Sequence, residues 1–237
     1  MAKANDTWRV LPHRPIEKLS ARVWRVEGDL EGMPLKRVMT IAKRDDGKLV
    51  VHNAMALDDA AMAEIDAWGP VATIIVPNGY HRLDAKVFAD RYKDARVLTP
   101  SGARKKVEEG VTVSGSLEDF EPDGTVALET FDGTNAAEGA MVIREPGATT
   151  LVLNDTVFNM PHVGGFTGFV LKHLAKSTGG PTISRISRMF VVKDKPAFRS
   201  HLERLAGAPD LRRVIVSHHE VIDREPARVL REVASTL

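Results

Sequence analysis

The sequence predicts an α/β fold in which two β-sheets pack face to face with helices on their outer sides. Three observations lead to this fold class. Two β-rich stretches, at residues 21–52 and 111–153, are each followed by segments of helical pattern, and layered elements of this kind share one core. Residues 71–98 have the order strand, turn, helix and strand, which is a βαβ unit. No repeat, low-complexity tract or long linker interrupts the chain, so we expect one domain over residues 1–237.

The first β-rich stretch contains three expected strands, at residues 21–26, 37–42 and 48–52. The first of them alternates apolar and polar residues around Trp24, as a half-buried strand does. Asp46-Gly47 separates the other two, and Asp-Gly between apolar runs is a strong hairpin signal. We therefore expect these strands to pair with one another in one sheet.

The βαβ unit is preceded by a helix that we expect to end at Trp68, because Gly69-Pro70 cannot continue it. Residues 71–76 are apolar except for Thr73, which is the pattern of a strand buried on both faces. The unit is completed by a polar turn at 77–84, a short helix at 85–92 and a strand at 95–98.

The second β-rich stretch predicts four short strands, at residues 111–113, 125–130, 139–144 and 149–153. Helical patterns follow at residues 166–176, 195–205 and 226–237, and one further buried strand is expected at 213–216. Strands followed by helices in both halves of the chain give the layered arrangement stated above.

Composition excludes several classes of protein. The chain has 33 Lys and Arg against 32 Asp and Glu, and this near-zero balance argues against bulk nucleic-acid binding. The absence of cysteine excludes a disulfide framework, a thiolate metal site and a cysteine nucleophile. The first residues lack the apolar region of a signal peptide, and the longest apolar runs are only of strand length. We therefore expect a cytoplasmic protein that does not insert into a membrane.

Three expected strands end in polar residues that a core does not need. His81 and Asp84 follow the first strand of the βαβ unit, Asp155 follows the last strand of the second β-rich stretch, and His218 follows the late strand. Ligands of α/β folds gather at the carboxyl ends of strands. His and Asp are also the residues that bind a borderline divalent ion where thiols are absent. The pattern predicts a metal site formed by these loops.

The order of these motifs resembles that of the metallo-β-lactamase superfamily, from Trp24 to the C-terminus. That superfamily has an αββα sandwich with a His-x-His-x-Asp-His loop after a buried strand, then a bridging Asp and a last His. The segment Leu151-Val152-Leu153-Asn154-Asp155-Thr156-Val157-Phe158 looks like the one that carries the bridging Asp. The segment Val214-Ile215-Val216-Ser217-His218-His219 looks like the one that carries the last His. The resemblance implies a metallo-β-lactamase-like αββα sandwich and a metal-dependent hydrolase.

The His-rich loop of that superfamily is degenerate in this chain. Counted from the end of the strand, the first two His positions fall on Asn78 and Tyr80. Counted back from Asp84, they fall on Tyr80 and Arg82. The middle His, expected three residues before a glycine that starts a strand, falls on Ala136. The resemblance therefore implies a degenerate active site that lacks part of the usual ligand set.

Four candidate metal ligands remain, namely His81, Asp84, Asp155 and His218. They supply enough groups for one ion but not for the two-metal site of the superfamily. Zn²⁺ is compatible with this donor set, and with two carboxylates in it Mn²⁺ or Fe²⁺ is at least as plausible. Asp84 has a second possible role in catalysis, as the general base that orients the attacking water.

Each candidate also has a purely structural interpretation. Asp155 can cap the backbone after its strand, and His218 can be a satisfied core histidine. His81 can be a turn residue, and Asp84 can be the N-cap of the helix at 85–92. From the sequence alone, both interpretations of each residue stay open.

Two functions follow from these alternatives. The first is a mononuclear metal-dependent hydrolase of a small ester, amide or phosphoester. The second is a non-catalytic protein on the same fold that has lost its metal site and binds a small molecule in the old cleft. A hydrolase loses activity with a chelator and regains it with one metal, whereas a binding protein is indifferent to the chelator. In both cases the expected partner is a small molecule rather than a nucleic acid or a membrane.

Overall fold

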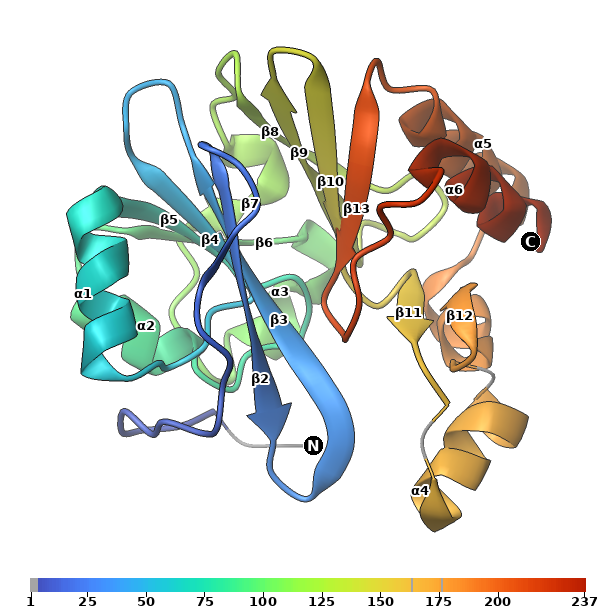
Figure 1. Cartoon of the computed structure of the whole chain (residues 1–237), viewed down its shortest axis with the longest axis horizontal. Helices are drawn as coiled ribbons and strands as arrows, with labels where there is room; N and C mark the ends of the chain where they lie inside the picture. Colours follow the sequence, from blue (N-terminus) through green and yellow to red (C-terminus); the bar gives the residue numbers. More distant parts are fainter. Residues whose placement is uncertain (1–3, 163, 176) are drawn as a thin grey trace.

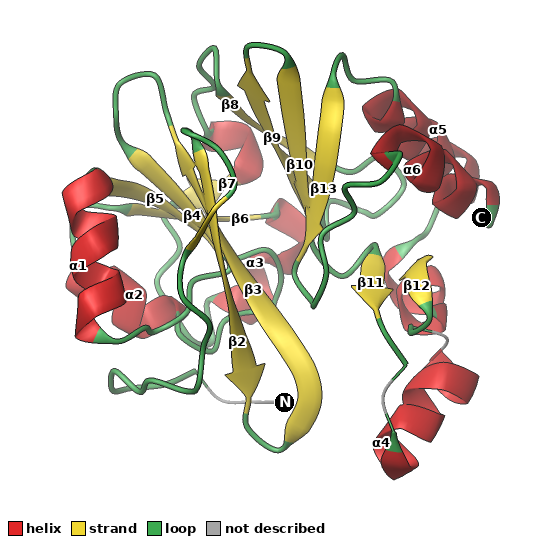
Figure 2. Ribbon diagram, viewed as in Figure 1, coloured by secondary structure: helices red, strands yellow, loops and turns green. Residues whose placement is uncertain are grey.

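The structure is a computed structural model that describes residues 4–162, 164–175 and 177–237. Two β-sheets face each other, and helices cover the outer side of each sheet (Figure 1). Figure 2 shows the same four layers, with the strands in the middle and the longer helices outside. This arrangement confirms the αββα sandwich predicted from the sequence.

Within the described residues, the first sheet has seven strands, in the order in which they occur along the chain. Neighbours are antiparallel through the fourth strand, and parallel beyond it. The strands are β1 (Glu17–Lys18), β2 (Val23–Leu30), β3 (Met33–Lys43), β4 (Leu49–His52), β5 (Val71–Ile75), β6 (Arg96–Thr99) and β7 (Gly115–Ser116). The predicted hairpin between β3 and β4 is present, and Gly47 supplies the positive φ of its turn, at 82°.

In the part of the chain that the structure describes, the second sheet has four strands, in the order β13-β10-β9-β8. Its members are β8 (Val126–Thr130), β9 (Gly139–Glu145), β10 (Ala148–Leu153) and β13 (Leu211–Val216), of which β10 and β13 are parallel neighbours. A separate antiparallel pair is formed by β11 (Phe158–Met160) and β12 (Gly180–Thr182). The prediction of a strand at residues 111–113 is wrong. Val111 and Val113 are buried, but they belong to a loop that packs against the first core.

The helices match the predicted ones with small shifts at their ends, except that the short helix at Arg104–Val107 was not predicted. They are α1 (Asp59–Trp68), α2 (Ala85–Arg91), α3 (Arg104–Val107), α4 (Gly165–Phe169), α5 (Lys195–Ala206) and α6 (Pro226–Ser235). Shorter helical turns are η1 (Ser101–Ala103), η2 (Leu117–Asp119), η3 (Val170–Ala175) and η4 (Ser187–Val191). The helix predicted at 166–176 is divided between α4 and η3, and its last residue, Lys176, lies outside the described residues. None of the described helices has the length and apolar character needed to cross a membrane.

Three layers of apolar side chains hold the sandwich together. One layer lies between the first sheet and helices α1 and α2, and another lies between the second sheet and helices α5 and α6. The third layer lies between the sheets, where Val38 and Ile75 of the first sheet pack with Val152 and Ile215 of the second. This contact fixes the ends of β5, β10 and β13 relative to one another, and the loops that leave those ends form the site described next.

Candidate functional site

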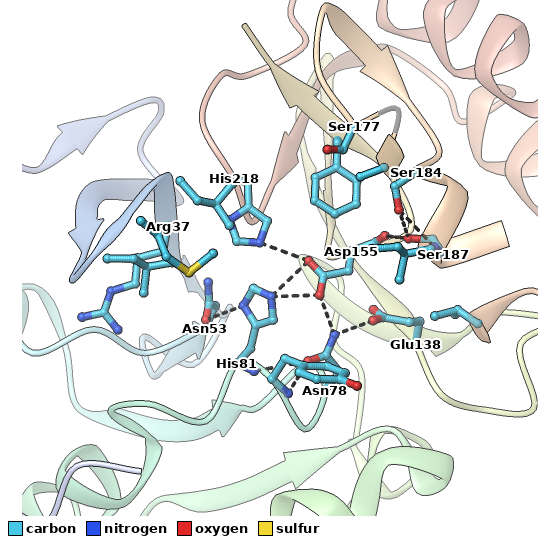
Figure 3. A pocket seen from close by; sticks show the side chains of 18 of the residues that line it. Arg37, Asn53, Asn78, His81, Glu138, Asp155, Ser177, Ser184, Ser187 and His218 are labelled. Atoms are coloured by element: carbon cyan, nitrogen blue, oxygen red, sulfur yellow. Dashed lines mark hydrogen bonds and ion pairs between the residues drawn. The ribbon is translucent and has the colours of Figure 1, made fainter. Parts of the chain in front are cut away.

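Three of the four predicted ligand residues meet at one edge of the sandwich. His81 Nε2 lies 3.1 Å from each carboxylate oxygen of Asp155, and His218 Nε2 lies 3.1 Å from Asp155 Oδ1. One ligand atom from each of the three residues lies within 4.8 Å of the other two. Figure 3 shows the Asp155 carboxylate facing both imidazole rings. We call His81, Asp155 and His218 the His–Asp–His cluster.

The sheet topology explains why these side chains converge. Strands β10 and β13 are parallel neighbours, with Leu153 opposite Val216. Asp155 and His218 each follow these residues by two positions, so they leave the sheet at the same edge. His81 comes from the turn after β5 in the opposite sheet. The cluster therefore joins the two sheets.

Backbone and side-chain carbonyls orient both imidazoles. His218 Nδ1 lies 2.7 Å from the backbone carbonyl of Lys36, and His81 Nδ1 lies 3.1 Å from Asn53 Oδ1. Asn53 Nδ2 donates to the backbone carbonyl of Val38 at 2.8 Å, which turns Asn53 Oδ1 toward the histidine. Carbonyl oxygens only accept hydrogen bonds, so each Nδ1 carries a proton and donates it. In a neutral imidazole this leaves the lone pair on Nε2, as in metal-binding histidines.

The cluster therefore consists of hydrogen-bond acceptors that face one another. Burial raises the pKa of Asp155, but the positive charge and Nε2–H hydrogen bonds of the protonated forms of His81 and His218 outweigh burial and hold it well below its usual range. The carboxylate is thus ionised at neutral pH. Two Nε2 lone pairs directed at an ionised carboxylate repel it unless the rings take up protons or a cation lies among them. Two imidazole nitrogens and one carboxylate oxygen are a donor set that suits Zn²⁺, Mn²⁺ or Fe²⁺.

Asn78 occupies a position where the resemblance implies a histidine, and its side chain makes four hydrogen bonds. Its Nδ2 donates to Glu138 Oε1 at 2.7 Å and to Asp155 Oδ2 at 2.9 Å. Its Oδ1 accepts from the backbone N–H groups of Tyr80 at 2.8 Å and His81 at 3.2 Å. Asn78 therefore fixes both the turn that carries His81 and the orientation of the Asp155 carboxylate.

Glu138 is a site residue that sequence reasoning missed. It is buried, and its carboxylate also accepts from Asn154 Nδ2, which is 3.1 Å from both oxygens. Burial and the nearby charge of Asp155 raise the pKa of Glu138 well above its usual range. Glu138 directly precedes β9, in the segment where the resemblance places the middle His on Ala136, but it does not occupy that position, and the contact with Asn78 is what reveals its place in the site.

Asp84, the fourth predicted ligand, lies outside the cluster in a network of its own. Its Oδ2 accepts from Arg37 Nη2 at 2.5 Å and from the backbone N–H of Ala56 at 3.0 Å. Its Oδ1 accepts from Asn5 Nδ2 at 2.7 Å. The Asp84 side chain is fully buried, and it makes no capping hydrogen bond to helix α2. Asp84 thus stands at the N-cap position of α2 without capping it through its side chain, and it forms a buried ion pair with Arg37 instead of joining the cluster.

The second histidine of the late loop faces a different group. His219 Nε2 accepts from the backbone N–H of Lys36 at 3.2 Å, while His218 binds the carbonyl of the same residue. His218 and His219 therefore connect the loop after β13 to β3, because they bind the carbonyl and the N–H group of the same residue, Lys36. Of the two, His218 alone belongs to the cluster.

The cluster lies in the wall of a cavity of about 470 Å³, a size that suits a small-molecule ligand. Phe158 lines the cavity and stacks on the ring of His218, with 5.6 Å between centroids and 4° between planes. Polar groups of the lining gather near the cluster in Figure 3. The apolar lining residues are Leu30, Met33, Leu35, Leu83, Phe158, Ala175, Ile186, Phe190 and Val191.

Comparisons with known proteins agree with this architecture. No protein-family model matches the sequence, and neither does any curated protein. Among solved structures, the DIM-1 metallo-β-lactamase exposed to ceftazidime matches at 13% identity and a TM-score of 0.63, over 96% of this chain and 99% of that one. A metallo-β-lactamase from Pontibacter korlensis matches at 13% identity and a TM-score of 0.60, over 94% and 99%. TMB-1 matches at 13% identity and a TM-score of 0.61, over 95% and 99%. The chain has the metallo-β-lactamase fold.

Proposed function

We propose that this chain is a mononuclear metal-dependent hydrolase that cleaves a small ester, amide or phosphoester. The observation that carries the proposal is the convergence of two Nε2 atoms and one ionised carboxylate at the edge of a small-molecule cavity. Carbonyl acceptors that hold both Nδ1–H groups support it, because metal-binding histidines have such partners.

In this proposal His81, Asp155 and His218 hold one divalent ion. Three protein ligands leave a further position open, which is the arrangement of catalytic rather than structural sites. A bound ion of this kind acts as a Lewis acid toward a carbonyl or phosphoryl oxygen and makes water a better nucleophile near neutral pH. Asn78 and Glu138 occupy the region next to the cluster with hydrogen bonds of their own, which favours one ion over two.

The rest of the site positions these groups. Arg37 lies on β3 between Lys36 and Val38. The carbonyl of Lys36 orients His218 directly, and the carbonyl of Val38 orients His81 through Asn53. The buried pair with Asp84 holds Arg37 in place. We therefore propose that Asp84 is a positioning residue that acts through β3, since the structure does not place it in the lining of the cavity.

The reaction adds one water molecule across the bond that is cleaved. For an ester or amide, the water oxygen joins the acyl carbon, the bond to the leaving oxygen or nitrogen breaks, and the leaving atom takes up a proton. The chain contributes a cavity with a largely apolar lining, and in such surroundings electrostatic stabilisation of the charge that develops on the carbonyl oxygen is stronger than in water.

The proposal is tested with p-nitrophenyl acetate, an amino acid p-nitroanilide and p-nitrophenyl phosphate as substrates. We expect hydrolysis of at least one of them, its loss after treatment with a chelator, and its recovery with one of Zn²⁺, Mn²⁺ or Fe²⁺. Hydrolysis that is indifferent to the chelator would contradict the metal-dependent reaction. A protein that binds no metal and cleaves none of the three would instead fit the non-catalytic alternative.

A further inference from the structure

Large apolar side chains surround the mouth of the cavity and are exposed to solvent. Met33 is 53% exposed, Tyr80 72%, Ile186 58% and Phe190 68%, although all four line the cavity. They come from the start of β3, from the turn after β5, and from η4 with the residue before it. Exposed apolar residues that gather around one opening, rather than being scattered singly, indicate a binding surface.

The polar residues of the cavity are largely engaged by the protein itself. Arg37 is the only Lys or Arg among the described residues of the lining, and its Nη2 pairs with Asp84 at 2.5 Å. Ser187 donates to the backbone carbonyl of Asp155 at 2.5 Å, and its hydroxyl lies 2.8 Å from that of Ser184. An anionic ligand would therefore find, among the described lining residues, no cationic side chain that lacks a carboxylate partner, although Arg37 Nε is buried without a hydrogen bond of its own.

From these two observations we infer that the substrate is a neutral carboxylic ester or amide with a bulky apolar group. This inference rests on the proposed function and narrows it by removing the phosphoester. The apolar group of the substrate packs against Met33, Ile186 and Phe190 at the mouth, and the carbonyl carbon lies at the His–Asp–His cluster. Hydrolysis consumes one water and gives an apolar carboxylic acid and an alcohol or amine, with the proton on the leaving oxygen or nitrogen.

A binding experiment tests the ligand class without relying on catalysis. The neutral fluorescent probe N-phenyl-1-naphthylamine is titrated into the whole chain and displaced with 2-nonanone, a neutral ketone that cannot be hydrolysed, or with octyl phosphate. We expect 2-nonanone to displace the probe at least tenfold more effectively than octyl phosphate. Equal or stronger displacement by octyl phosphate, or no binding of the probe, would overturn the inference.

Two neighbouring substitutions locate the probe. Phe190→Ser removes an exposed aromatic ring from the mouth and is expected to weaken binding about tenfold, because the bound probe loses its apolar contact with that ring. Met189→Ser is the matched control, because Met189 is 63% exposed on the same helical turn but does not line the cavity. Equal effects of the two substitutions would overturn the assignment of the mouth.

The hydrolysis of p-nitrophenyl acetate, butyrate and octanoate by the metal-loaded chain tests the substrate itself. Each methylene that becomes buried is expected to raise kcat/KM by up to about fourfold, and Phe190→Ser is expected to flatten this series. A flat series with the unsubstituted chain would overturn the inference. Displacement of the probe by 2-nonanone, without hydrolysis of these esters or of the anilide and phosphate used above, would refute the proposed function but support the apolar ligand class, so the two failures are distinguishable.

Discussion

The substitution Asp84→Asn separates the role of this residue in stability from a role in metal binding. Asp84 is fully buried, and its carboxylate accepts hydrogen bonds from Arg37, Ala56 and Asn5. Asparagine has nearly the same shape but no charge, and its NH₂ group turns one acceptor into a donor. The substitution therefore leaves the buried guanidinium of Arg37 without its counter-ion.

The expected cost follows from the burial of the pair. Breaking a buried ion pair by removing one partner costs about 3–5 kcal/mol of unfolding free energy. For a chain of this length, each kcal/mol corresponds to about 2–4 °C in Tm. We therefore expect Asp84→Asn to lower Tm by about 6–20 °C in differential scanning calorimetry. Metal content measured with saturating metal at low temperature, where the variant is folded, should stay at the value of the unsubstituted chain, because the three ligands remain and a loss of positioning lowers only the affinity.

A matched control is Asp66→Asn, which removes the partner of Arg91 at an ion pair whose side chains are both partly exposed. Exposed pairs contribute at most about 1 kcal/mol, so its Tm should change by only a few degrees. The reasoning would be refuted if Asp84→Asn lost the metal while keeping its Tm, because Asp84 would then act as the ligand that its sequence position suggested. A Tm change no larger than that of the control would also refute it.

Two further predictions concern the groups around the cluster. Asn53 has a φ of 59°, so Asn53→Gly keeps the backbone conformation while removing the acceptor for His81 Nδ1. We expect about 10–100-fold weaker metal binding, measured in competition with a chelating dye. Unchanged affinity would count against the orienting role of Asn53. The raised pKa of Glu138 means that folding favours its protonated form. The contribution of this carboxyl group to the free energy of unfolding is therefore fully present below its ordinary pKa of 4.5 and is lost as pH rises through the raised value. The Tm of the chelator-treated chain should therefore decrease more between pH 5 and pH 8 than that of Glu138→Gln, and parallel decreases would contradict this assignment.

The fold was predictable because its signals are local. Asp46-Gly47 between apolar runs specifies the hairpin of β3 and β4, and the apolar run that contains Thr73 specifies the buried strand β5. The same reasoning fails at Val111 and Val113. Their alternation records burial against the first core rather than strand pairing, and sequence alone does not distinguish the two.

The site was predictable only where residues follow strand ends. His81, Asp155 and His218 each follow a buried strand, and parallel pairing of β10 with β13 brings two of them to one edge. The orienting groups carry no such signal, because Lys36 acts through its backbone carbonyl and Asn53 through a contact with a loop 28 residues away. These contacts depend on how the two sheets pack together, and no local pattern encodes that.

The groups that differ from expectation have the same explanation. Asp84 stands at the start of a helix and near a histidine, so both capping and metal binding were open, but the partner that engages it comes from β3. Glu138 lies near the position of the middle His but not in it, and gains its place through Asn78, which is 60 residues away. In both cases a partner distant in sequence decides the role of a carboxylate.

The central claim is that the His–Asp–His cluster binds one divalent ion, and elemental analysis tests it most directly. The purified chain is dialysed with Zn²⁺, Mn²⁺ or Fe²⁺ and compared with Asp155→Ala, His218→Ala and His162→Ala, the last of which replaces an exposed histidine outside the cluster. We predict about one equivalent of one metal in the unsubstituted chain and in His162→Ala, and its loss in Asp155→Ala and His218→Ala. No stoichiometric metal under any condition, or equal metal in all four proteins, would contradict the claim.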